Sequence, residues 1–211
     1  MNIIIPMAGM GKRMRPHTLT TPKPLIKIAG KSIVHHLIYE IKEVLDEPIE
    51  EINFVIGRFG EDVENNLKGL AEEVGAKGRI SYQDDPLGTA HAVHCAKESL
   101  QGKVIVAFSD TLFKANFKLN TENDGIIWTK KVNDPSSFGV VKKDKEDMVS
   151  GFFEKPKEFV SDEAIIGVYF FRNGDELQRE IQYLLDHDIR GNKEYQLTDA
   201  LENMRKNENR F

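Results

Sequence analysis

The sequence predicts an α/β fold built on a mixed, mostly parallel sheet with helices on both of its faces. In the first half of the chain, short apolar runs alternate with helical patterns, which is typical of βαβ units. In the second half, strand-like runs follow one another with little helix between them, which indicates an antiparallel elaboration of the sheet. No repeat or linker interrupts the 211 residues, so we expect one domain spanning 1–211.

The first half supplies the parallel strands and the helices that connect them. Strands are expected where short apolar runs end at turn residues, at 2–7, 52–56, 79–83 and 103–108. Helices are expected where apolar residues recur at helical spacing, at 32–45, 61–74 and from 88 to about 99. Ser32 is a suitable N-cap for the first helix, and Gly75 would stop the second. Ligands of open α/β sheets bind at the carboxyl ends of such strands.

The second half contains the remaining strands and two closing helices. Strand-like runs cover 124–131, 139–142, 149–154 and 165–171. The run 173–186 predicts an amphipathic helix, and 197–206 predicts a last helix capped by Thr198 or Asp199.

Composition limits the partners that this chain can have. A net charge of −5 argues against broad binding to nucleic acid or to an anionic membrane. The single cysteine, Cys95, excludes an internal disulfide and fits a reducing compartment. Neither a signal peptide nor a run of transmembrane length is present, so we expect a soluble, cytoplasmic protein, and we leave a homo-oligomer open.

The loop after the first strand has the composition of a backbone cradle for phosphate. Residues 8–13 read Ala-Gly-Met-Gly-Lys-Arg, in which two glycines allow close approach and two cations follow. The dinucleotide fingerprint and the P-loop both fail, because Met14 and Pro6 stand where each needs a glycine. Prolines stiffen a loop of about fifteen residues that presents Lys23, and long loops in compact domains tend to be functional. We therefore favour a nucleoside triphosphate site over a plain glycine turn.

The run 6–16, with Thr18 and the Pro-Lys-Pro-Leu of 22–25, resembles the N-terminal signature of the sugar-1-phosphate nucleotidylyltransferases, in particular the glucose-1-phosphate thymidylyl- and uridylyltransferase branches. The resemblance implies a three-layer α/β/α, Rossmann-like nucleotidyltransferase fold. It also implies an enzyme that condenses a nucleoside triphosphate, with dTTP or UTP favoured, with a sugar-1-phosphate, with glucose-1-phosphate favoured. The products would be a nucleotide sugar and pyrophosphate.

Nucleotidyl transfer needs a charge clamp on the triphosphate, a bridging metal and an in-line acceptor phosphate. No general base is needed, because the acceptor oxygen is already anionic near neutral pH. The motif assigns Arg13 to the charge that develops on pyrophosphate, because a guanidinium grips two phosphate oxygens at once. Lys23 would neutralise the α-phosphate or the incoming phosphate; the alternative for both cations is a solvated surface charge. Around them, nucleotide contacts are expected from Ala8, Gly9, Gly11 and, as a minor contact, Lys12.

Asp110 follows a buried-looking apolar run, where a ligand for Mg²⁺ is expected at a carboxyl strand end. An Asp after a strand is often only a turn former. The segment 108–113 resembles the metal-binding Gly-Asp segment of the family, with Ser109 in place of the glycine, and it assigns Asp110 as a catalytic Mg²⁺ ligand. Relatives carry a second metal-binding Asp in a Trp-x-Asp-x-Gly segment, whereas Trp128 stands elsewhere. We therefore expect a domain without its C-terminal strand or extension, which binds nucleotide better than it turns over.

The segment 83–90 resembles the base-recognition segment of the family. Gln83 can offer both a donor and an acceptor to a nucleobase, and Pro86 and Gly88 shape the turn that lets the backbone approach it. The alternative is a strand-to-helix turn with an incidental Gln. His91 and His94 lie three residues apart with no acidic or cysteine partner nearby, so they are interpreted as ordinary helix residues.

Three later segments, 138–141, 154–156 and 164–169, resemble the sugar site of the family in its order. The resemblance assigns Gly139 and Glu154 to sugar hydroxyls, Lys155 to the sugar phosphate, and Gly167 to the same site. Neighbouring residues of a regular strand face opposite ways, so Glu154 and Lys155 can both act only if the strand ends there. The alternative is a surface Glu-Lys turn. The segment 194–199 resembles another family segment, but a helix cap explains it equally well.

Two other classes of function compete with the enzyme. One is a catalytically weak binding or regulatory module that keeps the same pocket. The other is a glycosyltransferase of related fold, which would need an Asp-x-Asp motif where Ser109-Asp110-Thr111 offers one acid.

Overall fold

The computed structural model describes residues 1–9 and 21–211. Its principal strands are β1 (Asn2–Pro6), β4 (Glu51–Ile56), β5 (Lys77–Tyr82), β6 (Val104–Ala107), β7 (Gly125–Lys131), β8 (Gly139–Lys143), β9 (Val149–Glu154) and β10 (Glu163–Phe171). The helices are α1 (Ile33–Val44), α2 (Glu61–Glu73), α3 (Thr89–His94), α4 (Gly174–Asp186) and α5 (Leu197–Lys206), with short 3₁₀ turns at Lys23–Leu25 and Lys97–Ser99. A small hairpin of β2 (Lys27–Ile28) and β3 (Lys31–Ser32) was not predicted, because two-residue strands carry no periodicity.

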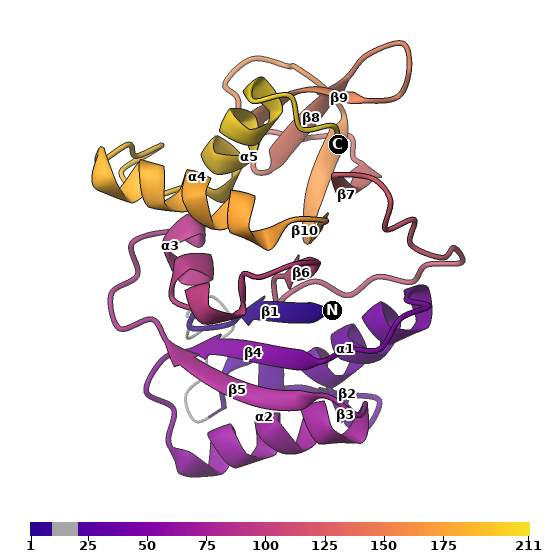
Figure 1. Cartoon of the computed structure of the whole chain (residues 1–211), viewed down its shortest axis with the longest axis vertical. Coiled ribbons are helices and arrows are strands. Elements are labelled where there is room, and N and C mark those ends of the chain that lie inside the picture. Colours follow the sequence, from indigo (N-terminus) through magenta and orange to yellow (C-terminus); the bar gives the residue numbers. More distant parts are fainter. Residues whose placement is uncertain (10–20) are drawn as a thin grey trace.

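One eight-stranded sheet runs through the described residues in the order β5-β4-β1-β6-β10-β8-β9, with β7 also paired to β10. Strands β5, β4, β1 and β6 are parallel to one another. The other half is antiparallel, since β10 runs against β6, β7 and β8. The predicted division into a parallel half and an antiparallel half is therefore confirmed (Figure 1).

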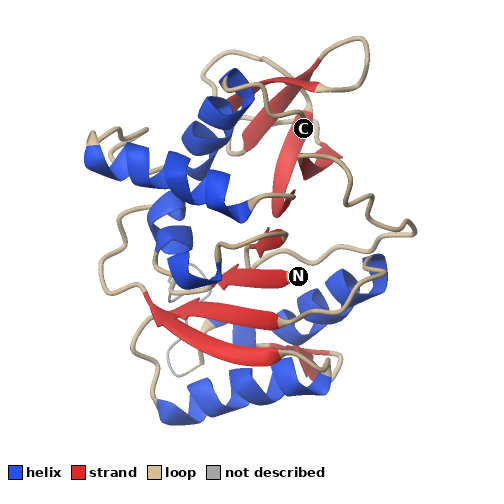
Figure 2. Cartoon of the chain, in the orientation of Figure 1, coloured by secondary structure: helices blue, strands red, loops and turns tan. Residues whose placement is uncertain are grey.

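Helices cover both faces of the sheet, and alternate residues of β1 show how the two cores are separated. Ile3 and Ile5 belong to the core formed with α1 and α2. Ile4 belongs to the other core, formed with α3, α4 and α5. Successive strand residues point to opposite faces, so a continuous apolar run indicates a strand buried on both sides. The three-layer α/β/α prediction is confirmed, and Figure 2 shows α4 and α5 packed together beside the sheet.

The end of α3 and the N-cap of α5 differ from the prediction, because residues distant in sequence form hydrogen bonds at these two places. The third helix ends at His94, and Ser99 then accepts a hydrogen bond from Asn53 at 2.8 Å in a separate 3₁₀ turn. Neither Thr198 nor Asp199 caps α5. The cap position holds Gln196 without a side-chain bond, and Thr89 Oγ1, from the start of α3, accepts from the backbone N–H of Leu197 at 2.8 Å. By contrast, Ser32 caps α1 as predicted, accepting from the His35 N–H at 3.2 Å.

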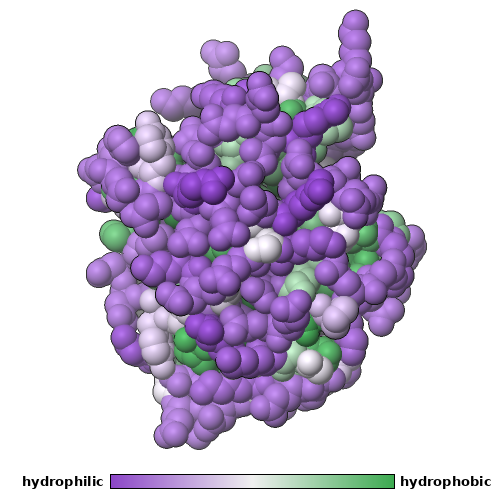
Figure 3. Space-filling model, viewed as in Figure 1, coloured by the Kyte–Doolittle hydropathy of each residue, from purple (hydrophilic) through white to green (hydrophobic). Residues whose placement is uncertain are grey.

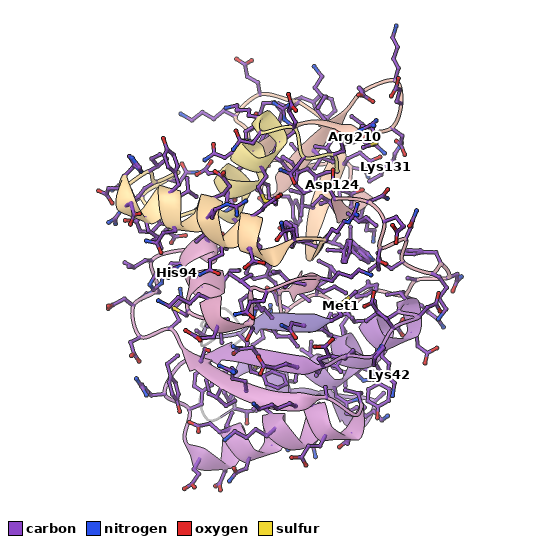
Figure 4. All side chains as sticks on the ribbon, viewed as in Figure 1. Met1, Lys42, His94, Asp124, Lys131 and Arg210 are labelled. Carbon is purple, nitrogen blue, oxygen red and sulfur yellow. The ribbon has the colours of Figure 1, made fainter. Side chains whose placement is uncertain are left out.

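The last residues of the chain close the antiparallel half. The Gly125 N–H donates to the Arg210 carbonyl at 3.2 Å, and Figure 4 shows Asp124 and Arg210 near each other beside β7. The Phe211 ring packs edge-on against Phe152 and Phe171. Polar side chains cover most of the face drawn in Figure 3, with scattered apolar groups between them. Among the described helices, none has the length and apolar character needed to cross a membrane.

Candidate active site

A cavity of about 350 Å³ opens at the carboxyl ends of the parallel strands, beside the start of α3. Every nucleotide-side residue predicted within the described part of the chain lines it: Ala8, Gly9, Lys23, Gln83, Pro86, Gly88 and Asp110. Gly11, Lys12 and Arg13 lie outside the described residues. The segments singled out around positions 8, 23, 83 and 110, far apart in sequence, thus meet at one place.

A second cavity, of about 1030 Å³, lies between the end of β6 and the antiparallel half of the sheet. The residues predicted for the sugar side all line it: Gly139, Glu154, Lys155 and Gly167. The two cavities share four lining residues, Thr89, Phe108, Asp110 and Glu194. They therefore adjoin, and Asp110 stands at their junction.

Lys23 and Asp110 form an ion pair at this junction. The Lys23 Nζ donates to Asp110 Oδ2 at 3.1 Å, and the two side chains are 30% and 57% exposed. Lys23 starts a 3₁₀ turn held between prolines, and Asp110 follows β6. An exposed pair of this kind contributes little stability and exchanges readily for other partners.

The surroundings of Asp110 suit a Mg²⁺ ion that is shared with a substrate phosphate better than a metal ion held by protein side chains alone. Mg²⁺ commonly takes one or two carboxylates and completes its shell with water and substrate phosphate. Across residues 1–9 and 21–211, no three His, Cys, Asp or Glu side chains are grouped so as to hold an ion by themselves. A metal at this site would thus depend on Asp110 together with a phosphate ligand.

Gln83 is held by contacts with the turn that follows it and with helix α3. Its Nε2 donates to the Gly88 carbonyl at 3.2 Å and lies 3.1 Å from Nδ1 of His91. Burial lowers the pKa of His91, and the nearby Asp85 acts in the opposite direction. The sequence interpretation of His91 as an ordinary helix residue missed this contact with the predicted base reader. Spacing along the helix gave no signal for it, because Gln83 precedes the helix.

Gly88 has a structural reason to be glycine in addition to the one predicted. Its φ is +124°, and a Cβ there would lie 2.6 Å from the backbone nitrogen of Tyr195. On either side of it, the Ala90 N–H donates to the Tyr195 carbonyl at 2.9 Å, and the Tyr195 N–H donates to the Leu87 carbonyl at 2.8 Å. The backbone of the 194–196 segment thus fixes the loop that carries Gln83.

Glu154 and Lys155 lie where a strand ends, which is the condition under which both side chains can face the same site. Strand β9 ends at Glu154, and Lys155 adopts a left-handed φ of +45°, while its N–H donates to the Phe138 carbonyl at 3.1 Å. The Lys155 Nζ lies 3.4 Å from Glu154 Oε1, and Glu154 Oε2 accepts from Thr198 Oγ1 at 3.1 Å. Both charged side chains therefore line the larger cavity.

The site also contains residues that the sequence did not assign. Glu194 lines both cavities, and Thr89 lines both while its hydroxyl accepts from Leu197. The sequence did contain a signal for Glu194, because the segment 194–199 resembles a family segment. A helix cap explained the same residues equally well, so Glu194 was not assigned to the site. Thr89 could be suspected only from its place after Gly88.

Comparison with known proteins identifies the family of this chain. Residues 2–210 match the model of the family described as Nucleotidyl transferase. The chain is 35% identical over 177 residues to a mannose-1-phosphate guanylyltransferase catalytic subunit beta of Drosophila pseudoobscura pseudoobscura, covering 80% of this chain and 47% of that protein. The chain thus spans about half the length of this curated relative.

Solved structures share the fold. A putative glucose-1-phosphate thymidylyltransferase from Bacillus anthracis superposes with a TM-score of 0.75 at 22% identity, covering 94% of this chain and 80% of that one. A UDP-glucose pyrophosphorylase complexed with UDP-glucose gives 0.76 at 22% identity, covering 100% and 88%. From the family match and the identity to its relative, the chain belongs to the nucleotidyl transferase family, among the sugar-1-phosphate nucleotidylyltransferases.

Proposed function

We propose that this chain transfers a nucleotidyl group from a nucleoside triphosphate to a sugar-1-phosphate. The observation that carries the proposal is the junction of two adjoining cavities at Asp110, one lined by the nucleotide-side residues and the other by the sugar-side residues. In the reaction, an oxygen of the sugar phosphate attacks the α-phosphorus and a new P–O bond forms. The bond between the α-phosphorus and the bridging oxygen breaks, and pyrophosphate leaves.

The smaller cavity would hold the nucleotide. Gln83 and the Pro86–Gly88 turn would contact the base, and the backbone of Ala8 and Gly9 would approach the phosphates. Lys23 would neutralise charge at the α-phosphate. Since Lys23 is paired with Asp110 before nucleotide binds, its transfer to a phosphate oxygen would free the Asp110 carboxylate.

The larger cavity would hold the acceptor. The Glu154 carboxylate can accept hydrogen bonds from sugar hydroxyls, and Gly139 on the paired strand leaves room beside it, since a Cβ there would lie 3.1 Å from Glu154 Oε2. Lys155 would neutralise the sugar phosphate, and Gly167 lines the same cavity. A Mg²⁺ ion held by Asp110 would supply charge stabilisation between the α-phosphate and the leaving pyrophosphate.

For the substrates, we propose dTTP or UTP together with glucose-1-phosphate. Support comes from the signature at 6–25 and from the likeness in fold to a thymidylyltransferase and to a UDP-glucose pyrophosphorylase. A second pair, GTP with mannose-1-phosphate, is favoured by the 35% identity to a mannose-1-phosphate guanylyltransferase.

Pyrophosphate release tests the proposal. The chain is mixed with each triphosphate and each sugar-1-phosphate, with and without Mg²⁺. Asp110→Ala should abolish metal-dependent release, whereas Asp62→Ala, at an exposed aspartate of α2, should not change it. An unchanged rate in Asp110→Ala would overturn the metal assignment.

A second candidate is a nucleotide-binding module with weak turnover. It is favoured by the lack, within the described residues, of a cluster of metal-ligating side chains beyond Asp110. Removing one charge-stabilising group commonly lowers a rate by about 10²–10³. Nucleotide binding without pyrophosphate release from any substrate pair would favour this module over the enzyme.

A further inference from the structure

The carboxamide of Gln83 has one orientation that satisfies its neighbours. The Gly88 carbonyl can only accept a hydrogen bond, so the group 3.2 Å from it must be the Gln83 nitrogen. The same nitrogen lies 3.1 Å from His91 Nδ1. Both hydrogens of the amide are thus directed to partners inside the protein. The atom of Gln83 that remains for a ligand in the cavity is its carboxamide oxygen, which is purely an acceptor.

This arrangement requires His91 to accept through Nδ1, and therefore to be unprotonated there. His91 is partly buried in the first turn of α3, and burial lowers its pKa, while the charge and the backbone carbonyl of Asp85 oppose this effect. Along the same helix, His94 would repel a charged His91, and Asp186 of α4 acts on His94. Near neutral pH, Nδ1 is consequently free to accept from Gln83.

We propose that His91 is a positioning residue, which accepts one hydrogen of the Gln83 amide and so reserves the carboxamide oxygen for the nucleobase. The inference rests on the proposed function, in which Gln83 reads the base. A lone acceptor favours bases that present a ring N–H, namely uracil, thymine and guanine. It disfavours cytosine and adenine, which present a ring lone pair at the corresponding place, because two acceptors would then face each other.

The proposal has a pH dependence of defined sign. Below the pKa of His91, Nδ1 carries a hydrogen and can no longer accept from Gln83. The amide is then drawn to turn its oxygen toward the imidazolium, and its nitrogen toward the ligand. The preference for ring N–H bases should therefore be present above this pKa and decline as pH falls through it.

Nucleotide affinities measured in matched pairs test this role. Calorimetric titrations with UTP and CTP, and with GTP and ATP, give two affinity ratios between about pH 5.5 and pH 8. Within a pair the triphosphates are identical, so their own titration cancels. His91→Phe should lower the UTP/CTP ratio about tenfold at the upper pH, the effect of one hydrogen bond. His91→Asn keeps an acceptor that does not titrate, so it should keep the ratio and remove its pH dependence.

His94→Phe is the matched control. His94 lies on the same helix (Figure 4), and its buried Nδ1 has no hydrogen-bond partner within the described structure. His94→Phe should therefore leave both affinity ratios unchanged at the upper pH, where His91 is neutral. If the wild-type chain binds no triphosphate, the base site itself is wrong and the inference falls with it. If the wild type is selective and His91→Phe is equally so, the positioning role is wrong while the proposed function stands. If His91→Phe does not fold, a His91→Asn pH profile parallel to that of the wild type overturns the role.

Discussion

Replacing Gly88 by alanine should be among the most damaging single-methyl additions in this chain. The glycine has a φ of +124°, which an L-residue adopts only with strain of about 1–3 kcal/mol. The added Cβ would also lie 2.6 Å from the Tyr195 nitrogen, so the backbone of the 194–196 segment would have to move.

The size of the loss follows from what that movement breaks. Two hydrogen bonds, of 2.9 Å and 2.8 Å, join Tyr195 to Ala90 and to Leu87, and each contributes about 1 kcal/mol. Together with the backbone strain, Gly88→Ala should lower the free energy of unfolding by about 3–5 kcal/mol. The displacement would also move Glu194, which lines both cavities, so nucleotide affinity should fall in the fraction that remains folded.

Urea denaturation followed by circular dichroism measures this loss, and Gly75→Ala provides a control. Gly75 also has a positive φ, of +84°, but a Cβ there would meet no atom within 4 Å. The control should therefore lose only the conformational component, about 1–2 kcal/mol. Equal losses in the two variants would refute the argument that close packing against Tyr195 requires the glycine.

Three further predictions follow from single residues. Lys155→Gly should leave the free energy of unfolding unchanged or raise it by up to about 1 kcal/mol, because glycine adopts the left-handed φ of +45° without strain. The same substitution should raise the KM for sugar-1-phosphate severalfold, and denaturation and steady-state kinetics measure the two effects. Ser99→Ala should cost about 2–3 kcal/mol in urea denaturation, because it leaves the buried amide of Asn53 without its 2.8 Å partner. The Arg205 guanidinium holds the pKa of Glu202 below its ordinary value of 4.5. The stability that this carboxylate contributes is therefore present above pH 4.5 and is lost as pH falls through the lowered pKa. The thermal midpoint of Glu202→Gln should decline less on acidification than that of the wild type.

Much of the fold could be predicted because its strongest signals are local. The run 104–107 is wholly apolar, as expected of a strand covered on both faces, and it forms β6 as predicted. The third helix was predicted too long because its end depends on tertiary contacts. Ser99 accepts from Asn53, and its carbonyl accepts from Asn2 at 3.1 Å, and these bonds outweigh the helical propensity of the residues between.

The candidate site was predictable wherever one segment carries its own chemistry. Gln83, Asp110 and the Glu154-Lys155 pair each lie in such a segment, and the structure places them all around the two adjoining cavities. Their roles remain predictions. Contacts between segments could not be read from the chain, because Thr89 meets Leu197 from 108 positions away. The same reason hid the contact of His91 with Gln83, which depends on the turn between a strand and a helix.

Asp110 lies where the sheet changes from parallel to antiparallel strand pairing. Strand β10 runs antiparallel to β6, and the Phe108 N–H donates to the Gly167 carbonyl at 2.8 Å. The pairing of β10 with β7 shifts register between Ile165 and Tyr169, and Gly167, with a φ of +83°, lies inside this bulge. A strand end and a bulge therefore meet where the parallel half gives way to the antiparallel half. The parallel half can line a nucleotide cavity and the antiparallel half an acceptor cavity, and a residue that follows β6 lines both.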